Sequence, residues 1–381
     1  MPLSMVQGSQ HQQQYPFNQN DAEIQHAVAY FRTLQNDDGG FSNPGSESAM
    51  SNTQWMIMAL AAAGEDPHDW KKNGHSSIGY LKENADMVTS TTDYERIILA
   101  LVAAGENPRD FAGRDFVREL KKNSLKENGQ FSDFTYTTIW GILALSAAGE
   151  DVSKSAAWLK DQQNDDGGFS WVPSGKSDYD DTAVALEALI AAGENPDSRV
   201  IKDALEYLKT GLNDDGGFKY FGSSPSNAAS DAWVIQALVT CGHDPKGQEW
   251  TVNEKNPVGH LLSLQQPDGS FNYTTYVKSN PGYMTVCAVM ALLGKPYPIK
   301  PQSQVQPEPT VTPTPTATTI TSTPTPASLS QQPTPTAATP AVTAETPSTS
   351  NDAATVAGFE FLFCCSGLLL VAFTVLLRRN A

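Results

Sequence analysis

Apolar side chains recur at i, i+3 and i+4 along six short stretches of the chain, a spacing typical of one buried helix face. Each stretch is followed by a second, more uniformly apolar run, such as residues 55–63 and 139–148, that stops at a glycine. The first stretches are residues 27–35, 77–83, 116–122, 156–163, 204–210 and 258–266. The second runs stop at Gly64, Gly105, Gly149, Gly193, Gly242 and Gly294. The pattern predicts twelve helices arranged as six hairpins.

The six hairpins are copies of one unit, because the shared glycines follow one another at intervals of 41, 44, 44, 49 and 52 residues. A repeated unit of this size cannot bury its own apolar face and must stack on its neighbours. Six hairpins can close into a ring with the second helices inside and the first helices outside. We therefore expect an all-α fold, an (α/α)6 toroid over residues 21–298.

A recurring turn sequence joins the two helices of most hairpins. It reads Asn-Asp-Asp-Gly-Gly-Phe at residues 36–41, 164–169 and 213–218, and is shorter at 267–271. Glycine supplies the positive φ that ends a helix, and the Phe is expected to fill the apolar layer. The turn acids lack the alternating spacing of an EF-hand, so capping is favoured over calcium binding. Capping boxes are expected at residues 51–54 and 92–95.

The chain outside the repeats has a different composition. Residues 1–20 are polar, Gln-rich and without an apolar signal segment, and are expected to be disordered. Residues 299–355 form a Thr/Pro-rich stretch, with 15 Thr and 11 Pro between positions 301 and 350. Such a composition is typical of a disordered, O-glycosylated stalk.

Residues 356–377 are long and apolar enough to form one transmembrane helix. Arg378 and Arg379 follow at once, so residues 378–381 are expected to be a cytoplasmic tail and the toroid extracellular. An extracellular toroid needs an export signal, which we expect to lie upstream of the first residue shown.

Charge and cysteine content exclude some function classes. The formal net charge of −17 argues against nucleic acid as a partner. The four cysteines form no disulfide framework and no Cys/His cluster for zinc, since Cys241 and Cys287 lie at opposite ends of equivalent helices. We expect no metal and no cofactor.

The repeat resembles the one shared by squalene and oxidosqualene cyclases and by protein prenyltransferase β-subunits. The residues that carry the resemblance are 34–41, 163–169 and 265–271, each with a Gln before an Asp-Gly-Gly/Ser-Phe turn. The resemblance implies a toroid with a central cavity. It does not imply an enzyme, because the superfamily includes complement thioester domains and cobalamin carriers.

The C-terminal tail is similar to the Pro-Gly-Phe sorting tails of archaeal surface proteins. Gly358-Phe359-Glu360 and the terminal arginines match, whereas Ala357 stands where those tails have Pro.

One motif points to catalysis. Residues 178–183 read Asp-Tyr-Asp-Asp-Thr-Ala and are similar to the signature of class II terpene cyclases such as squalene–hopene cyclase. That resemblance makes Asp180 the acid that protonates an alkene or epoxide, with Asp178 and Asp181 shaping its pKa. The alternative is structural. Counted back from the shared glycine, Asp181 aligns with Asn52, Asp93, Thr137 and Ser230, a position we expect to cap the second helix. Known cyclases also enclose their substrate between two helical domains, and only one toroid is predicted here.

Protein prenylation is not expected. That family uses an Asp-x-Cys zinc motif, whereas Asp231 is followed by Ala232 and Trp233. Cys241 and His243 lie at the far end of that helix. We predict no zinc-dependent prenyltransferase.

An aromatic residue stands near the start of each second helix, so these side chains are expected to surround one mouth of the ring. They are Trp55, Tyr94, Trp140, Tyr179, Trp233 and Tyr283. The loop residues Trp171, Tyr220, Phe221, Tyr273 and Tyr276 are expected nearby. An aromatic mouth suits a flat apolar ligand, a sugar or a peptide, although packing between helix pairs is the simpler explanation.

The preferred prediction is therefore a membrane-anchored cell-surface toroid that binds a small molecule or partner at this mouth. A class II terpene cyclase using Asp180 is the alternative. Asn272-Tyr273-Thr274 is an N-glycosylation sequon in a turn, and Asn272 is its acceptor.

Overall fold

The computed structural model describes residues 14–300, in which outer and inner helices alternate along the chain. The outer helices are α1 (Ala22–Leu34), α3 (Ser77–Glu83), α5 (Phe116–Ser124), α7 (Ser153–Lys160), α9 (Arg199–Lys209) and α11 (Pro257–Ser263). The inner helices are α2 (Met50–Ala62), α4 (Thr91–Ala103), α6 (Thr135–Ala147), α8 (Tyr179–Ala191), α10 (Ala228–Thr240) and α12 (Pro281–Leu292). The six predicted hairpins are confirmed.

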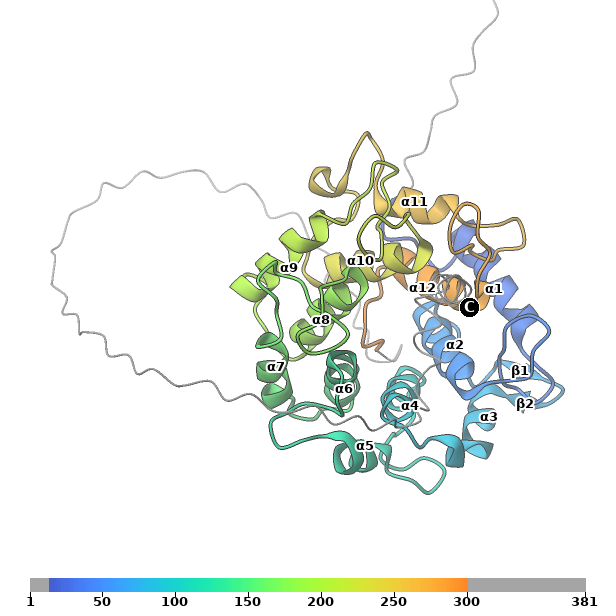
Figure 1. Cartoon of the computed structure of the whole chain (residues 1–381). Helices are drawn as coiled ribbons and strands as arrows, with labels where there is room; N and C mark the ends of the chain where they lie inside the picture. Colours follow the sequence, from blue (N-terminus) through green and yellow to red (C-terminus); the bar gives the residue numbers. More distant parts are fainter. Residues whose placement is uncertain (1–13, 301–381) are drawn as a thin grey trace, which may run out of the picture. The chain divides into compact units, whose positions relative to one another are not determined.

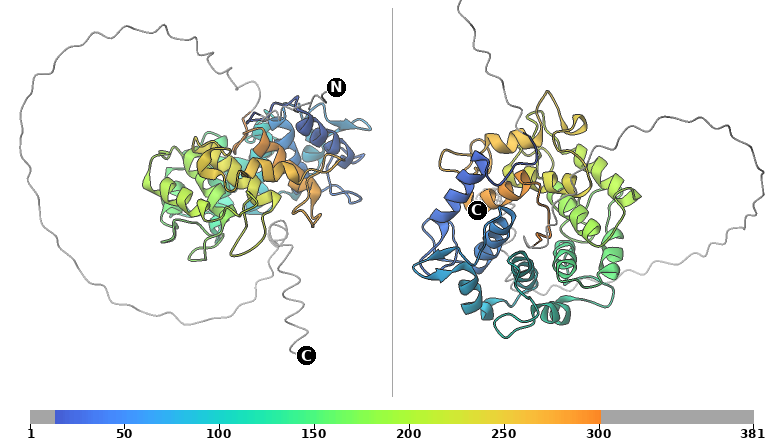
Figure 2. Two further views of the ribbon diagram at one scale, coloured as in Figure 1. Left: turned by 90° about the horizontal axis from the view of Figure 1, so that it is seen from above. Right: turned by 180° about the vertical axis from the view of Figure 1, so that it is seen from behind.

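The inner helices form a closed ring (Figures 1 and 2). Each packs on the next in chain order, and α12 packs back on α2. The predicted (α/α)6 toroid is thus confirmed, and each shared glycine has the expected positive φ, between 59° at Gly294 and 91° at Gly193. Only short non-α elements interrupt the pattern within residues 14–300: the antiparallel strands β1 (Lys71–Lys72) and β2 (His75–Ser76), and the 3-10 helices η1 (Ala85–Met87) and η2 (Gln248–Trp250).

The stalk and the expected transmembrane segment lie outside the described residues, as does the tail that resembles sorting signals. Within residues 14–300, none of the helices combines the length and the apolar character that a membrane span requires.

The ring closes through the same contact that joins neighbouring hairpins. The glutamine before the turn donates its amide N–H to the chain of the next hairpin, from Gln35 to the Trp70 carbonyl (2.9 Å) and from Gln163 to the Val200 carbonyl (2.8 Å). Gln265 of the last hairpin donates in the same way to the Glu23 carbonyl of the first (2.8 Å). The turn glycine allows this approach, since a Cβ on Gly269 would lie 2.1 Å from the His26 carbonyl oxygen.

The turn phenylalanines fill the layer between outer and inner helices, as predicted. Phe41, Phe131, Phe169, Phe218 and Phe271 are fully buried. Burial of their backbone N–H groups requires acceptors. The side-chain oxygen of an inner-helix Thr accepts from Phe169 (Thr182, 2.8 Å), and Thr53, Thr138 and Thr285 do the same for Phe41, Phe131 and Phe271. In α2, α6, α8 and α12, a hydroxyl on the first turns of the inner helix therefore ties the turn to the ring.

The predicted capping boxes were wrong by a few residues. Helix α4 is capped by Ser90, which forms a capping box with Asp93, and α2 begins after Ala49 without a side-chain cap. Gln54 and Glu95 are instead buried inside their helices. The Ser/Thr-rich helix starts offered several alternative caps one turn apart, and packing selected among them.

Part of the N-terminal segment is packed. Phe17 is buried and its N–H donates to the Leu292 carbonyl (2.9 Å), while the Tyr15 hydroxyl donates to the Ala291 carbonyl (2.8 Å). The expectation of disorder over residues 1–20 does not hold for these positions, because two aromatic rings supply apolar area that a Gln-rich composition obscures.

Candidate functional site

Asp180 lies on the face of α8 that is directed at the axis of the ring. Val184 and Glu187 follow it at i+4 and i+7, and Glu187 contacts the segment that occupies the axis. Asp180 is 5% exposed, and one of its carboxyl oxygens is buried without a hydrogen-bond partner. Burial raises the pKa of Asp180 from its usual 3.8 to about 7, against the hydrogen bond from Ser230 that lowers it. An acid with this pKa holds or releases a proton near neutral pH.

The two neighbouring acids have different places from those expected. Asp178, not Asp181, is the N-cap of α8, and its carboxylate accepts the Asp181 N–H at 2.8 Å. Asp181 occupies the third helical position, so the alignment that made it a capping residue was wrong by one turn. Burial raises the pKa of Asp178 well above its usual value and that of Asp181 to about 6. The motif thus gathers three carboxyl groups at one helix start, of which Asp180 alone faces the axis.

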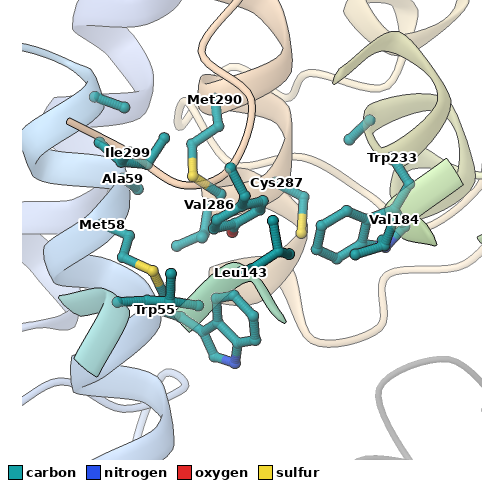
Figure 3. Packing of buried hydrophobic residues seen from close by; sticks show 14 of the residues in the cluster. Trp55, Met58, Ala59, Leu143, Val184, Trp233, Val286, Cys287, Met290 and Ile299 are labelled. Atoms are coloured by element: carbon teal, nitrogen blue, oxygen red, sulfur yellow. The ribbon is translucent and has the colours of Figure 1, made fainter. Parts of the chain in front are cut away.

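Four of the six predicted aromatics, Trp55, Trp140, Trp233 and Tyr283, form a collar around the axis. The Trp140 ring lies 5.2 Å from Trp55 and 5.8 Å from Trp233, and Tyr283 lies 5.7 Å from Trp55, measured between ring centroids. All four are between 3% and 7% exposed. Figure 3 shows Trp55 and Trp233 on opposite sides of this apolar cluster, with Val184 beside Trp233. The collar is a packed layer inside the ring, whereas the sequence predicted an open mouth.

The other two predicted aromatics face away from the axis. Tyr179 stacks on Tyr207 of α9 at 4.9 Å, and the Tyr94 hydroxyl accepts a hydrogen bond from Asn123 of α5 (3.2 Å). They belong to the layer between inner and outer helices. On a helix, a displacement of one or two positions is enough to move a side chain from the axis-facing side to the outward side. Counting from the shared glycine to the aromatic was therefore too coarse to predict the side.

Loops cover the starts of three inner helices. The carbonyl of Trp171 accepts the first N–H groups of α6, that of Tyr220 accepts the Tyr179 N–H of α8, and that of Tyr273 accepts the Ala228 N–H of α10. Each loop therefore satisfies helix-start donors of the preceding hairpin. These loop aromatics were predicted near the mouth, and their main-chain oxygens account for that position. Tyr276 is 95% exposed.

The collar is closed from within by the segment that follows α12. Tyr297 is 3% exposed, and its ring lies 5.3 Å from Trp140, 5.8 Å from Trp233 and 5.9 Å from Trp55. Its backbone N–H donates to Glu187 Oε2 at 2.6 Å. Burial raises the pKa of Glu187 well above its usual value. Sequence reasoning ended the toroid at residue 298 and missed this contact, although an aromatic between two prolines signals a segment outside any helix.

Asp231, considered above as a prenyltransferase metal ligand, has both carboxyl oxygens engaged. Oδ1 accepts the Phe218 N–H at 2.6 Å, where the other turns use Thr, and Oδ2 lies 2.5 Å from His260 Nδ1 on α11. Burial raises the pKa of Asp231. Burial alone would lower the pKa of His260, but the hydrogen bond that its ring donates to Asp231 raises it. His260 was not predicted, although it aligns with Tyr80 and Tyr207 in the outer-helix pattern.

Metal binding has no support in residues 14–300, which contain no group of three or more His, Cys, Asp or Glu side chains able to hold an ion. The turn acids act as expected for capping: Asp38, Asp166 and Asp215 each accept the N–H two residues later, at 3.0–3.1 Å. Cys241 and Cys287 are buried and are not joined in a disulfide. Asn272, the predicted glycan acceptor, is half-buried with its side-chain oxygen enclosed, a placement that disfavours modification of the folded ring.

The model of the prenyltransferase α/α toroid domain matches residues 6–208 and 182–306, which together are more than half of the sequence. The chain belongs to this family. Among curated proteins, none matches it in sequence.

Solved structures share the fold at low identity. A variant of the type II terpene cyclase MstE from Scytonema, in complex with its substrate geranylgeranyl dihydroxybenzoate, has a TM-score of 0.55 and 17% identity. The match covers 72% of this chain and 96% of the cyclase. A protein from Actinoplanes has a TM-score of 0.54 and 12% identity, over 72% of this chain and 98% of its own.

Proposed function

We propose that the toroid binds an elongated apolar guest in its central channel, against the aromatic collar. The supporting observation is that Trp55, Trp140 and Trp233, from three different inner helices, already enclose a planar ring, that of Tyr297, through mostly edge-to-face contacts. Such contacts favour a flat or unsaturated guest over a compact polar one.

Tryptophan fluorescence tests this proposal, with geranylgeraniol and squalene as probes. Saturable quenching is expected in the native protein and a loss of affinity of about tenfold in Trp140→Leu, since one collar contact is removed. Trp158→Phe is the matched control, because Trp158 lies on the outer helix α7 and is only partly buried. Unchanged affinity in Trp140→Leu would place the guest elsewhere.

A second candidate is acid-initiated cyclisation of an isoprenoid, with Asp180 as the proton donor. It is favoured by one observation: Asp180 faces the axis with a free carboxyl oxygen and a pKa near 7. The aromatic collar beyond it would stabilise the carbocations of such a reaction. The objection that a cyclase needs a second helical domain is weakened, since the match spans 96% of the Scytonema type II cyclase chain.

Incubation with squalene, geranylgeraniol or geranylgeranyl diphosphate, followed by mass spectrometry of extracted products, tests this candidate. Asp180→Asn is expected to lower product formation by at least about 100-fold, the contribution of a general acid. Asp166→Asn is the control, because it alters a turn acid remote from the axis. No product from the unmodified protein with any of the three would end the cyclase proposal while leaving guest binding intact.

We also propose that residues 356–377 anchor the protein in a membrane with the toroid outside the cell. The apolar span and the arginines after it support the proposal. Protease added to intact cells is expected to remove the toroid, and protection of the toroid would reverse the orientation.

A further inference from the structure

The residues that follow α12 turn into the ring and occupy its axis. Lys295 N–H donates to the Met290 carbonyl, and the chain then passes between the inner helices through Tyr297 and Ile299, which are 3% and 5% exposed. Figures 1 and 2 show this orange segment inside the circle of inner helices, and Figure 3 shows Ile299 beside Ala59. We call residues 295–300 the plug.

The plug is suited to an apolar channel because it needs few hydrogen-bond acceptors. Pro296 and Pro298 have no N–H group, so Tyr297 contributes the one main-chain donor among these three residues. That donor is satisfied by Glu187. The inner helix α8 thus supplies a side-chain carboxylate as acceptor at the position where the plug presents its Tyr297 N–H.

The fit is incomplete for the remaining polar atoms. The Tyr297 hydroxyl and Glu187 Oε1 are buried without hydrogen-bond partners, and so is the side-chain oxygen of Gln236 at the equivalent position of α10. Unsatisfied buried polar groups destabilise the packed state. A guest with a hydroxyl or amide group could satisfy these atoms, so the interior is built for more hydrogen bonds than the plug makes.

We propose that the plug is an internal ligand that closes the channel and is displaced by the guest. The guest would be an amphipathic molecule, with a planar or unsaturated apolar part for the collar and a hydrogen-bonding group for Glu187 and Gln236. This inference rests on the proposed guest binding and adds that binding competes with residues 295–300.

The rate at which the Cys287 thiol is labelled measures how often the plug opens. Its thiol is fully buried in α12, and Figure 3 shows it within the same cluster as Trp233 and Ile299. Cys241 lies at the end of α10 and serves as the internal reference. The experiment uses the full chain with Cys364→Ser and Cys365→Ser, so that these two thiols are the ones that a maleimide can label.

In the unliganded protein, maleimide is expected to label Cys287 at least tenfold faster than the protein unfolds globally. Hydrogen exchange of the α12 amides measures the rate of global unfolding. Tyr297→Ala should raise the rate at least tenfold further. The peptide Lys-Pro-Tyr-Pro-Ile-Lys added in trans should restore protection to that variant, and the same peptide with Ala for Tyr should not.

Labelling of wild-type Cys287 at the global unfolding rate would show that the plug is a fixed part of the fold and overturn the proposal, even where Tyr297→Ala does not fold. Geranylgeraniol separates the two proposals. If the plug opens but geranylgeraniol neither quenches tryptophan nor changes Cys287 labelling, the plug inference stands and the guest proposal fails. If geranylgeraniol quenches tryptophan fluorescence while Cys287 stays protected from labelling, the plug inference fails and the guest proposal stands.

Discussion

The fourth and fifth hairpins have the same framework but different buried acids. In both, a turn Phe donates its N–H to an inner-helix side chain 13 residues later, and a ring from the next outer helix packs on the second turn glycine. The acceptor and ring are Thr182 and Tyr207 in one case, Asp231 and His260 in the other. The fifth hairpin thus replaces a hydroxyl and a phenol ring by a carboxyl group and an imidazole that are hydrogen-bonded to each other.

In the fourth hairpin, by contrast, burial is the main cause that raises the pKa of Asp178 and of Asp180, and neighbouring carboxylates raise both values further. Asp178 and Asp180 each retain a carboxyl oxygen without a partner, and both pKa values are raised. A buried acid whose oxygens are all hydrogen-bonded is most simply explained by a structural role. One that faces the axis of the ring with an oxygen unbonded is a candidate for chemistry or ligand recognition. The comparison separates Asp231 from Asp180, which the sequence presents as similar helix-start acids.

The largest effect is expected on removing the acid of the fifth hairpin. Asp231→Ala leaves the Phe218 N–H and a buried His260 without their partner, and should lower the free energy of unfolding by about 3–5 kcal/mol. Thr182→Ala is the matched change in the fourth hairpin and should cost about 1–3 kcal/mol, because the lost acceptor is neutral. Urea denaturation measures both. Equal losses of unfolding free energy in the two variants would show that the Asp231–His260 pair is no more important to stability than Thr182.

The unpaired acid of the fourth hairpin should appear in the pH dependence of stability. Because the pKa of Asp180 is raised from 3.8 to about 7 on folding, its favourable contribution is present below pH 3.8 and lost as pH rises through 7. The loss amounts to up to about 4 kcal/mol, at 1.36 kcal/mol per unit of pKa. Asp180→Asn should flatten the curve between pH 4 and 7. Denaturation midpoints that fall equally in Asp180→Asn and wild type would contradict the raised pKa.

Replacing the Asp231–His260 pair by the Thr and Tyr found in the fourth hairpin should change the free energy of unfolding little. The double variant Asp231→Thr with His260→Tyr recreates the pair found at Thr182 and Tyr207, and should unfold within about 1.5 kcal/mol of the wild type. His260→Tyr alone should be worse than the double variant, because it leaves Asp231 charged and unpaired. A double-mutant cycle without coupling would show that the two positions do not act as a pair.

The smallest effect concerns metal. Zinc or a chelator should shift the melting temperature of the toroid by less than about 1 °C, since both Asp231 oxygens are already bonded and residues 14–300 contain no group of three side chains that could hold an ion. A stabilisation that saturates at one zinc per chain and disappears in Asp231→Thr would revive the prenyltransferase comparison.

Some details of the site were within reach of sequence reasoning. His260 aligns with Tyr80 and Tyr207, and Asp231 follows its turn Phe by the same interval as Thr182, so the paired change was visible in the repeats. The direction of each aromatic was not visible. Tyr179 and Trp140 both lie near inner-helix starts, yet one packs outward and the other toward the axis, since Tyr179 lies 14 residues before its shared glycine and Trp140 nine. A shift of five positions turns a helical side chain by about 140°.

The sequence by itself determined the number of hairpins, their turns and the closure of the ring, because repetition forces each unit to bury its face on the next. It also made Asp180 a candidate acid. The tertiary structure decided that Asp178 caps α8, that Asp231 pairs with His260, and that Tyr297 packs among the collar tryptophans. The last two outcomes depend on contacts between residues 29 and 110 positions apart, for which local periodicity carries no signal.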